Sequence, residues 1–209
     1  MSKFIEFFWI FITGSFIGYI CEMIWCIIRW KKIESRKGLI YGHLIPIYGI
    51  ATVIISFIIE IFNIEKYILF FIITFLICGI VEYISSLFQE KIFGTKSWDY
   101  SKMIGNLHGR INVLYLSIWS IMGIFWCNYY KKIINIIIIP LIKINLLPEI
   151  TILFFIFTLY NCFISICASY RQKLRRNGIE PKNKLEIWLD TKFNDDRMKK
   201  IYANAKIVE

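Results

Sequence analysis

Long, nearly uninterrupted apolar stretches dominate the pattern of this chain. About 20 consecutive apolar residues cross a hydrocarbon core of roughly 30 Å as an α-helix, and five stretches reach that length. Short polar segments separate them. The pattern therefore predicts an all-α fold, a polytopic membrane helix bundle with spans at residues 4–28, 39–62, 67–88, 107–126 and 150–169.

A further apolar stretch, residues 133–147, is interrupted by Asn135, Pro140 and Lys143. Counting it as a sixth span would place the basic C-terminal residues on the side of the membrane that disfavours them. We therefore expect residues 133–147 to form an interfacial or re-entrant segment on the outer side.

The distribution of positive charge sets the expected orientation. The chain carries a net charge of +10, with 25 Lys and Arg residues. If five spans start from an outside N-terminus, 20 of these residues lie inside and five outside. Cytoplasmic loops carry the excess of Lys and Arg, so the C-terminus is predicted to be cytoplasmic. Because the basic residues flank the spans, the positive-inside rule accounts for the positive net charge. No nucleic-acid partner is therefore expected.

Residues 170–209 are predicted to form a basic, amphipathic cytoplasmic tail. Leu185, Trp188 and Leu189 follow a helical spacing, and Asp195 suits the first turn of a second helix. Two placements stay open for this tail. It either lies on an anionic membrane surface or packs on the cytoplasmic loops.

Ionisable side chains inside the spans are the candidate functional residues, because each costs at least about 2.5 kcal/mol to insert. Glu22 lies seven residues before Arg29, about 10 Å along a helix from the inner end. Glu82 lies at a comparable depth, and we expect Arg110 to pair with Glu82 or Glu22. The predicted intramembrane polar cluster comprises Glu22, Glu82, Ser86, Glu90, Asn106 and Arg110.

The second span begins with residues that break helices. Gly42, Pro46 and Gly49 fall within eight residues, and irregular backbone at membrane depth is tolerated only against protein or water. A broken helix here would carry aromatic side chains beside the acidic cluster. The set comprises Gly38, Tyr41, Gly42, Pro46, Tyr48 and Gly49.

The loop before the fourth span contains Trp98, Asp99 and Tyr100. The aromatic pair fits the headgroup level, and Asp99 is expected to cap the following turn rather than to pair with a basic residue. His43 and His108 have no partner at the spacing of a metal site, and no GxxxxGK[ST] phosphate loop occurs. We therefore assign no catalytic residue, metal or cofactor.

Several of these residues belong to motifs that follow one another between Phe7 and Gly123. The motifs are Gly18-Tyr19-x-x-Glu22, Gly38-x-x-x-Gly42-x-x-x-Pro46-Ile47-Tyr48-Gly49, Glu82-Tyr83-x-x-Ser86-x-x-x-Glu90, Trp98-Asp99-Tyr100-Ser101 and Asn106-x-x-Gly109-Arg110. In order, spacing and polar identity they resemble the bacterial ABC-transporter type IV permease family (CmpB-like). Lys37, His43 and Gly105 depart from the residues usual in that family, which are Arg, Pro and Phe.

The resemblance implies a membrane subunit of a transporter in the bacterial cytoplasmic membrane, surrounded by membrane lipids. It further implies a separate ATP-binding cassette subunit and a homo-oligomer of membrane subunits. Two alternatives stay open. One is an integral membrane enzyme that acts on a lipid or lipid-linked substrate at the cytoplasmic leaflet, with paired carboxylates as acid and base. The other is a small scaffold or regulator whose polar cluster only fixes helix packing.

Overall fold

A computed structural model describes residues 3–62 and 66–208. Helices account for 73% of the chain, which confirms the all-α class. The helical elements are α1 (Lys3–Trp30), α2 (Pro46–Phe62), α3 (Tyr67–Phe88), the π-helix η1 (Gln89–Phe93), α4 (Val113–Lys143), α5 (Leu147–Arg176), α6 (Lys184–Lys192) and α7 (Asp195–Ile201). The two-residue strands are β1 (Thr95–Lys96), β2 (Asn106–Leu107), β3 (Ile111–Asn112) and β4 (Lys206–Ile207).

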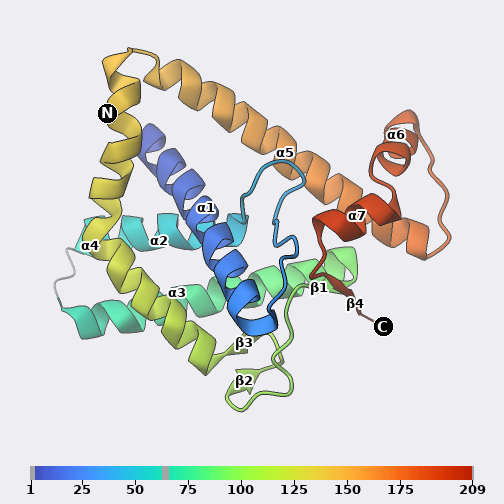
Figure 1. The fold of residues 1–209 in the computed structure, drawn as a ribbon, viewed down its shortest axis with the longest axis horizontal. Coiled ribbons are helices and arrows are strands. Elements are labelled where there is room, and N and C mark those ends of the chain that lie inside the picture. The colour runs from blue at the N-terminus through green and yellow to red at the C-terminus, as the bar shows by residue number, and fades with distance from the viewer. Residues whose placement is uncertain (1–2, 63–65, 209) are drawn as a thin grey trace.

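The long helices cross one another in Figure 1, where α2 and α3 lie roughly across the view and α1, α4 and α5 run obliquely or downward. Lys3 of α1 pairs with Glu60 of α2, whereas Gly18 of α1 meets Tyr48 of α2, so these helices are antiparallel. Gly123 of α4 meets Thr74 of α3, and the two helices pack in the same antiparallel way. We call the end that carries Lys3 the N-terminal end, and the end that carries Arg176 the basic end.

Small residues let α1 and α2 approach closely. Gly14 and Gly18 lie one turn apart on α1 and face Thr52 and Tyr48 of α2. A Cβ atom added at Gly49 would lie 2.6 Å from the carbonyl oxygen of Phe11. Close backbone approach at a small-x-x-x-small pattern is a usual basis of helix association in membranes. This seam places Tyr48 directly against α1.

The fourth span and the following segment were expected to be separate, and the structure joins them. Helix α4 begins only at Val113, because Asn112 caps it by accepting a hydrogen bond from the Leu114 amide over 3.0 Å. It then runs without interruption to Lys143, through Pro140. Ile134 and Ile138 are buried in the main core, which ties residues 133–143 to the bundle. The expected division into a span at 107–126 and a separate segment at 133–147 is therefore wrong for the secondary structure.

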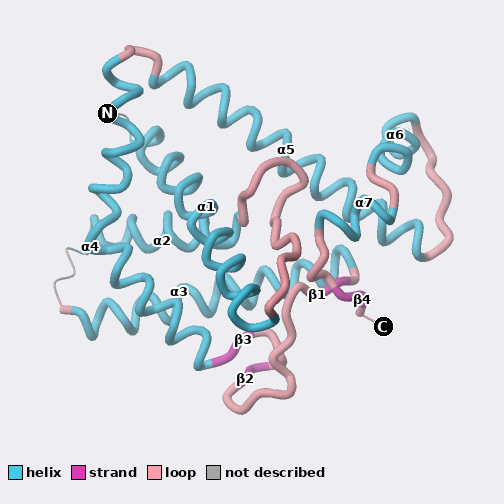
Figure 2. The backbone as a smooth tube through the Cα atoms, viewed as in Figure 1, coloured by secondary structure: helices cyan, strands magenta, loops and turns pink. Residues whose placement is uncertain are grey.

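The expected second span, residues 39–62, is helical only from Pro46 onward. Figure 2 shows the preceding loop rising from the end of α1 between α1 and α5 before it enters α2. Gly42 has a φ of +78°, a conformation that glycine adopts without strain. Gly49, by contrast, lies inside α2 with no interruption. We call residues 38–45 the inserted segment.

The tail forms the two expected helices, and α5 extends to Arg176 before the tail departs. Leu189, Phe193 and Met198 are almost fully buried against Ile40 of the inserted segment and Ala168 of α5. Strand β4 then pairs antiparallel with β1, Ile207 opposite Thr95. This face of the tail is therefore packed on the protein.

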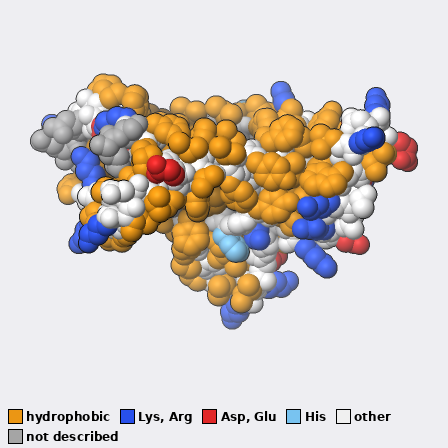
Figure 3. All heavy atoms as spheres, turned by 90° about the horizontal axis from the view of Figure 1, so that it is seen from above, with side chains coloured by type: hydrophobic (Ala, Val, Ile, Leu, Met, Phe, Trp, Pro, Cys, Tyr) orange, Lys and Arg blue, Asp and Glu red, His pale blue; other side chains and the backbone are white. Residues whose placement is uncertain are grey.

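Within residues 3–62 and 66–208, three helices are long and apolar enough to cross a membrane: α1, the continuous helix Tyr67–Phe93, and α5. Helix α2 is a shorter apolar helix. Figure 3 shows a broad apolar surface, with Lys and Arg side chains gathered toward the two ends of the molecule. This distribution fits a membrane protein.

Candidate functional site

Two carboxylates from different helices lie in the half of the bundle nearest the basic end. The Tyr48 hydroxyl donates to Glu22 Oε1 over 2.5 Å, and the Tyr100 hydroxyl donates to Glu82 Oε1 over 3.0 Å. Glu22 lies close enough to Glu82 for the two charges to repel one another. Each glutamate thus accepts a hydrogen bond from a different tyrosine, and the two glutamates belong to one site.

Aromatic rings extend this site onto α4. Trp119 packs on Tyr48 with ring centroids 4.8 Å apart, and Tyr115 stacks on Tyr100 at 4.9 Å. Tyr115 and Trp119 are one helical turn apart, so they share a face of α4. Burial, together with the Glu82 charge, raises the pKa of Tyr100 above its usual value, which keeps the hydroxyl a donor. We call Glu22, Tyr48, Glu82, Tyr100, Tyr115 and Trp119 the acidic–aromatic cluster.

Arg110 does not pair with Glu82 or Glu22 as the sequence suggested. Its Nη1 atom lies 2.7 Å from Glu90 Oε2 and donates to Ser86 Oγ over 3.3 Å. Lys96 also lies 3.5 Å from Glu90. Glu22 and Glu82 therefore belong to one group and Ser86, Glu90 and Arg110 to another, because Glu82 accepts from Tyr100 whereas Arg110 reaches Ser86 and Glu90.

Asn106 and Arg110 were expected on one helical face, and they instead lie in a turn. The Asn106 side chain accepts from the Gly109 amide over 2.9 Å, while Gly105 and Gly109 adopt positive φ. Trp98 Nε1 donates to the Arg110 carbonyl over 2.8 Å, which fixes the arginine backbone. The two glycines were the sequence signal for this turn.

The Trp98, Asp99 and Tyr100 motif orders the loop that supplies Tyr100 to the site. Asp99 Oδ1 accepts from the Ser101 amide over 2.9 Å, which confirms its expected role as a turn cap. This backbone hydrogen bond holds the pKa of Asp99 below its ordinary value. The Tyr100 amide in turn donates to the Gly109 carbonyl over 2.8 Å. The motif thus positions Tyr100.

Sequence reasoning missed the polar side chains that hold the inserted segment. Asn161 of α5 is fully buried; its Oδ1 accepts from the Tyr41 amide over 3.1 Å and its Nδ2 donates to the Tyr41 carbonyl over 2.7 Å. Ser165 accepts from the Ile40 amide over 3.0 Å. An asparagine in the middle of an apolar span was the signal, because such residues need polar partners.

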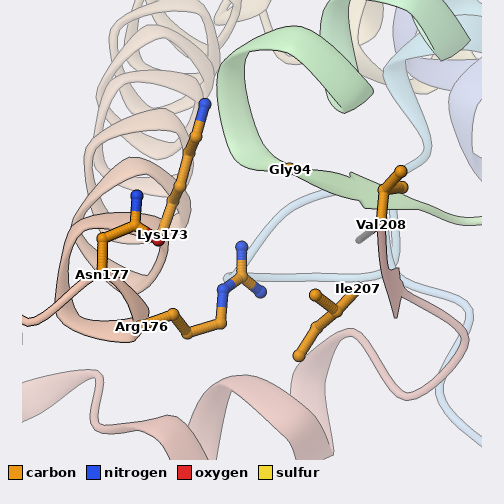
Figure 4. Close-up of a pocket in the computed structure, with 6 residues that line it drawn as sticks. All are labelled: Gly94, Lys173, Arg176, Asn177, Ile207 and Val208. Atoms are coloured by element: carbon orange, nitrogen blue, oxygen red, sulfur yellow. The ribbon is translucent and has the colours of Figure 1, made fainter.

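A hollow of about 420 Å³ lies beside the β1–β4 pair. Figure 4 shows Lys173 and Arg176 extending from α5 toward it. Lys173 Nζ donates to the Lys91 carbonyl over 2.8 Å and Arg176 Nη2 to the Phe93 carbonyl over 2.5 Å. Because both cations are already engaged, this hollow is a packing seam between α5 and η1.

Within the described ranges, no group of three or more His, Cys, Asp and Glu residues is arranged to hold a metal ion. The acidic–aromatic cluster offers two carboxylates, two tyrosine hydroxyls that already donate, and the two further aromatic rings of Tyr115 and Trp119. Carboxylates beside aromatic rings are suited to the recognition of a charged group.

The sequence model of one protein family matches residues 9–166, which include the whole cluster. That family is described as "Putative ABC-transporter type IV". The chain belongs to this family. The match ends within α5 and leaves the tail outside. Neither the curated proteins nor the solved structures contain a match to this chain.

Proposed function

We propose that this chain is a membrane subunit of an ABC-type transporter whose ATP-binding subunit is a separate protein. The family match over residues 9–166 carries this proposal. The chain has no GxxxxGK[ST] phosphate loop, so ATP would have to be bound by another chain. The acidic–aromatic cluster would face the transport pathway from the cytoplasmic side.

The proposed topology has five spans, with the N-terminus outside and the C-terminus in the cytoplasm of a bacterial cell. Its spans are α1, α2 with the inserted segment, α3, α4 and α5. Antiparallel packing of α1 with α2 and of α3 with α4 supports this order. The loop after α1, the loop after α3 and the tail hold 20 of the 25 Lys and Arg residues, and a cytoplasmic basic end satisfies the positive-inside rule.

The loop between β1 and β3 is the proposed contact with the ATP-binding subunit. Ile104 at its tip is fully exposed, although isoleucine is usually buried. The same loop carries Tyr100 and the Arg110 turn, so a partner bound at Ile104 would be linked to the cluster through a few hydrogen bonds.

Affinity purification at native expression level tests this function. The wild-type chain is expected to recover an ATP-binding subunit, and Ile104→Asp to recover much less of it. Ile33→Asp is the matched control, since Ile33 is also exposed but lies in the loop after α1. Repeated purification of the wild-type chain without any transport component would refute the proposal.

A second candidate is an integral membrane enzyme that acts on a lipid or lipid-linked substrate. The observation that favours it is the position of the two carboxylates, both in one half of the bundle, while the other half is an apolar core. Lipid profiling of a deletion strain separates the two candidates. Accumulation of a lipid precursor would support the enzyme, and an unchanged profile would contradict it.

A further inference from the structure

The negative charge of Glu22 and Glu82 has no basic counterpart. Among the described residues, the ion pairs use other carboxylates, with Arg110 and Lys96 both on Glu90. Glu82 is only 9% exposed, and its Oε2 atom has no hydrogen-bond partner. A buried carboxylate that has one hydrogen bond but no cationic partner is costly to ionise, so a positive charge from outside the chain would stabilise this site.

The walls around these carboxylates are aromatic. Tyr48 and Trp119 pack together on one side, and Tyr100 and Tyr115 stack together on the other. Trp25 of α1 meets Tyr115 edge-on at 5.7 Å. Aromatic faces attract diffuse cations, and several faces around one site are the usual means of recognising alkylated ammonium groups.

A hard metal ion fits this site poorly. Such ions take six or more oxygen ligands, and the cluster supplies two carboxylates whose nearest oxygens already accept hydrogen bonds from tyrosines. An alkylated ammonium group needs fewer oxygen contacts, because aromatic ring faces and nearby carboxylates together stabilise its positive charge.

We propose that the acidic–aromatic cluster binds an organic cation with an alkylated ammonium group, held between Glu22 and Glu82 and walled by Trp119 and Tyr115. Glu82 Oε2 is the atom that faces the charge. Binding itself is a property of this chain alone. That the cation is also the transported substrate rests on the proposed transport function.

Binding of choline chloride to the purified full-length chain in lipid nanodiscs tests the inference. Calorimetry and tryptophan fluorescence should both report saturable binding, and the neutral isostere 3,3-dimethylbutan-1-ol should bind at least about tenfold more weakly, because it lacks the charge. Equal binding of the two compounds, or no binding of choline, would overturn the inference.

Variants locate the site. Glu82→Gln should weaken choline binding at least about tenfold, and Trp119→Leu several-fold, whereas Trp119→Phe keeps a ring and should stay within about threefold of wild type. Glu149→Gln is the matched control: Glu149 is exposed at the start of α5 and should leave affinity unchanged. If Glu82→Gln fails to fold, Glu22→Gln takes its place. Unchanged affinity in the folded Glu variant would overturn the assignment.

Three further outcomes distinguish this inference from a bound proton and from the proposed transport function. An infrared band of a protonated carboxyl group that disappears in Glu82→Gln, together with no choline binding, would assign the missing positive charge to a proton and overturn the inference. A chain that recovers an ATP-binding subunit but does not bind choline refutes the organic cation alone. A chain that binds choline but recovers no such subunit refutes the transport function alone.

Discussion

The two ends of the helix bundle are packed with different chemistry. At the N-terminal end, the core consists of large apolar and aromatic side chains, with a few polar pairs such as the 3.0 Å bonds from Trp9 to Thr151 and from Trp126 to Ser56. At the basic end, carboxylates, tyrosines and an irregular inserted segment share the interior. Burial of apolar area stabilises the first half without directional requirements, whereas the second depends on individual hydrogen bonds.

This contrast separates stability from specificity. An apolar interface tolerates volume-conserving exchanges, but a polar network fails when one member is removed, because its partners remain buried and unsatisfied. Substitutions at the basic end should therefore remove function even when the side-chain volume changes little. Substitutions at the N-terminal end should do so only when the volume changes more. Substitutions at four residues test how far the protein depends on such individual contacts.

The largest effect is expected at Arg110. Arg110→Ala leaves Glu90 and Ser86 without their shared partner, and it should abolish function and lower the free energy of unfolding by about 3 to 5 kcal/mol. Arg110→Lys keeps the charge but loses the planar fork, so it should abolish function with a normal yield of folded protein. Lys102→Ala, on the exposed part of the same loop, is the control. Full activity and stability of Arg110→Ala would refute this role.

Gly49→Ala should have the next largest effect. The added methyl group would lie 2.6 Å from the Phe11 carbonyl oxygen, and backbone cannot give way as a flexible side chain does. Overpacking of this kind costs about 1 to 3 kcal/mol, and separation of α1 from α2 would also displace Tyr48 from Glu22. Thermal unfolding in detergent measures the loss. Ile50→Ala, on the exposed face next to it, should change stability little.

Asn161→Leu should release the inserted segment at a cost of about 2 kcal/mol. The change removes both hydrogen bonds to Tyr41 and leaves its buried amide and carbonyl unsatisfied. Labelling of a cysteine placed at Gly42 should then become faster. Asn128→Leu is a matched control, because Asn128 is exposed and bonds only to a carbonyl of its own helix. Equal labelling rates in the two variants would show that Asn161 does not hold the segment.

The smallest effect is expected at Asp190, which docks the tail on α5. Although burial opposes ionisation, hydrogen bonds from Arg171 and Arg175 hold the pKa of Asp190 below its ordinary value. The stabilisation is thus present above pH about 4 and is lost as the pH falls through the lowered pKa. Asp190→Asn should loosen the tail by about 1 kcal/mol at neutral pH. Limited proteolysis between α5 and α6 should detect this, and the two proteins should behave alike at lower pH.

Much of the helical architecture could be predicted from the sequence. Apolar stretches located α1 and α3 to within two residues and the start of α5 to within three, whereas α5 continues seven residues beyond its predicted end into the basic segment. Asn183 and Asn194 cap α6 and α7 where the tail was expected to be helical. The boundary at Val113 and the continuation through Pro140 were missed, since hydropathy does not register a cap or a helix sustained by packing.

The residues of the site were largely predicted, but their pairing was not. Glu22, Glu82 and Arg110 were recognised because an ionisable residue in an apolar stretch is costly whatever its partner. Which partner each takes depends on where the loop before α4 places Tyr100 and Arg110 along α3 and η1, and the spacing within the spans does not specify that placement. Tyr115, Trp119 and Asn161 went unnoticed because aromatic and amide side chains are ordinary in such segments until their neighbours are known.

The sequence by itself determined that this is an all-α membrane protein of its family, with costly charges in one half of the bundle. Those properties depend on composition and spacing along the chain, which need no knowledge of the fold. Only the tertiary structure decided that Arg110 belongs to Glu90, that Glu82 faces Tyr100, and that Asn161 holds the inserted segment. Each of these contacts joins residues at least 18 positions apart, and rotation of the helix by one residue, about 100°, would replace the partner.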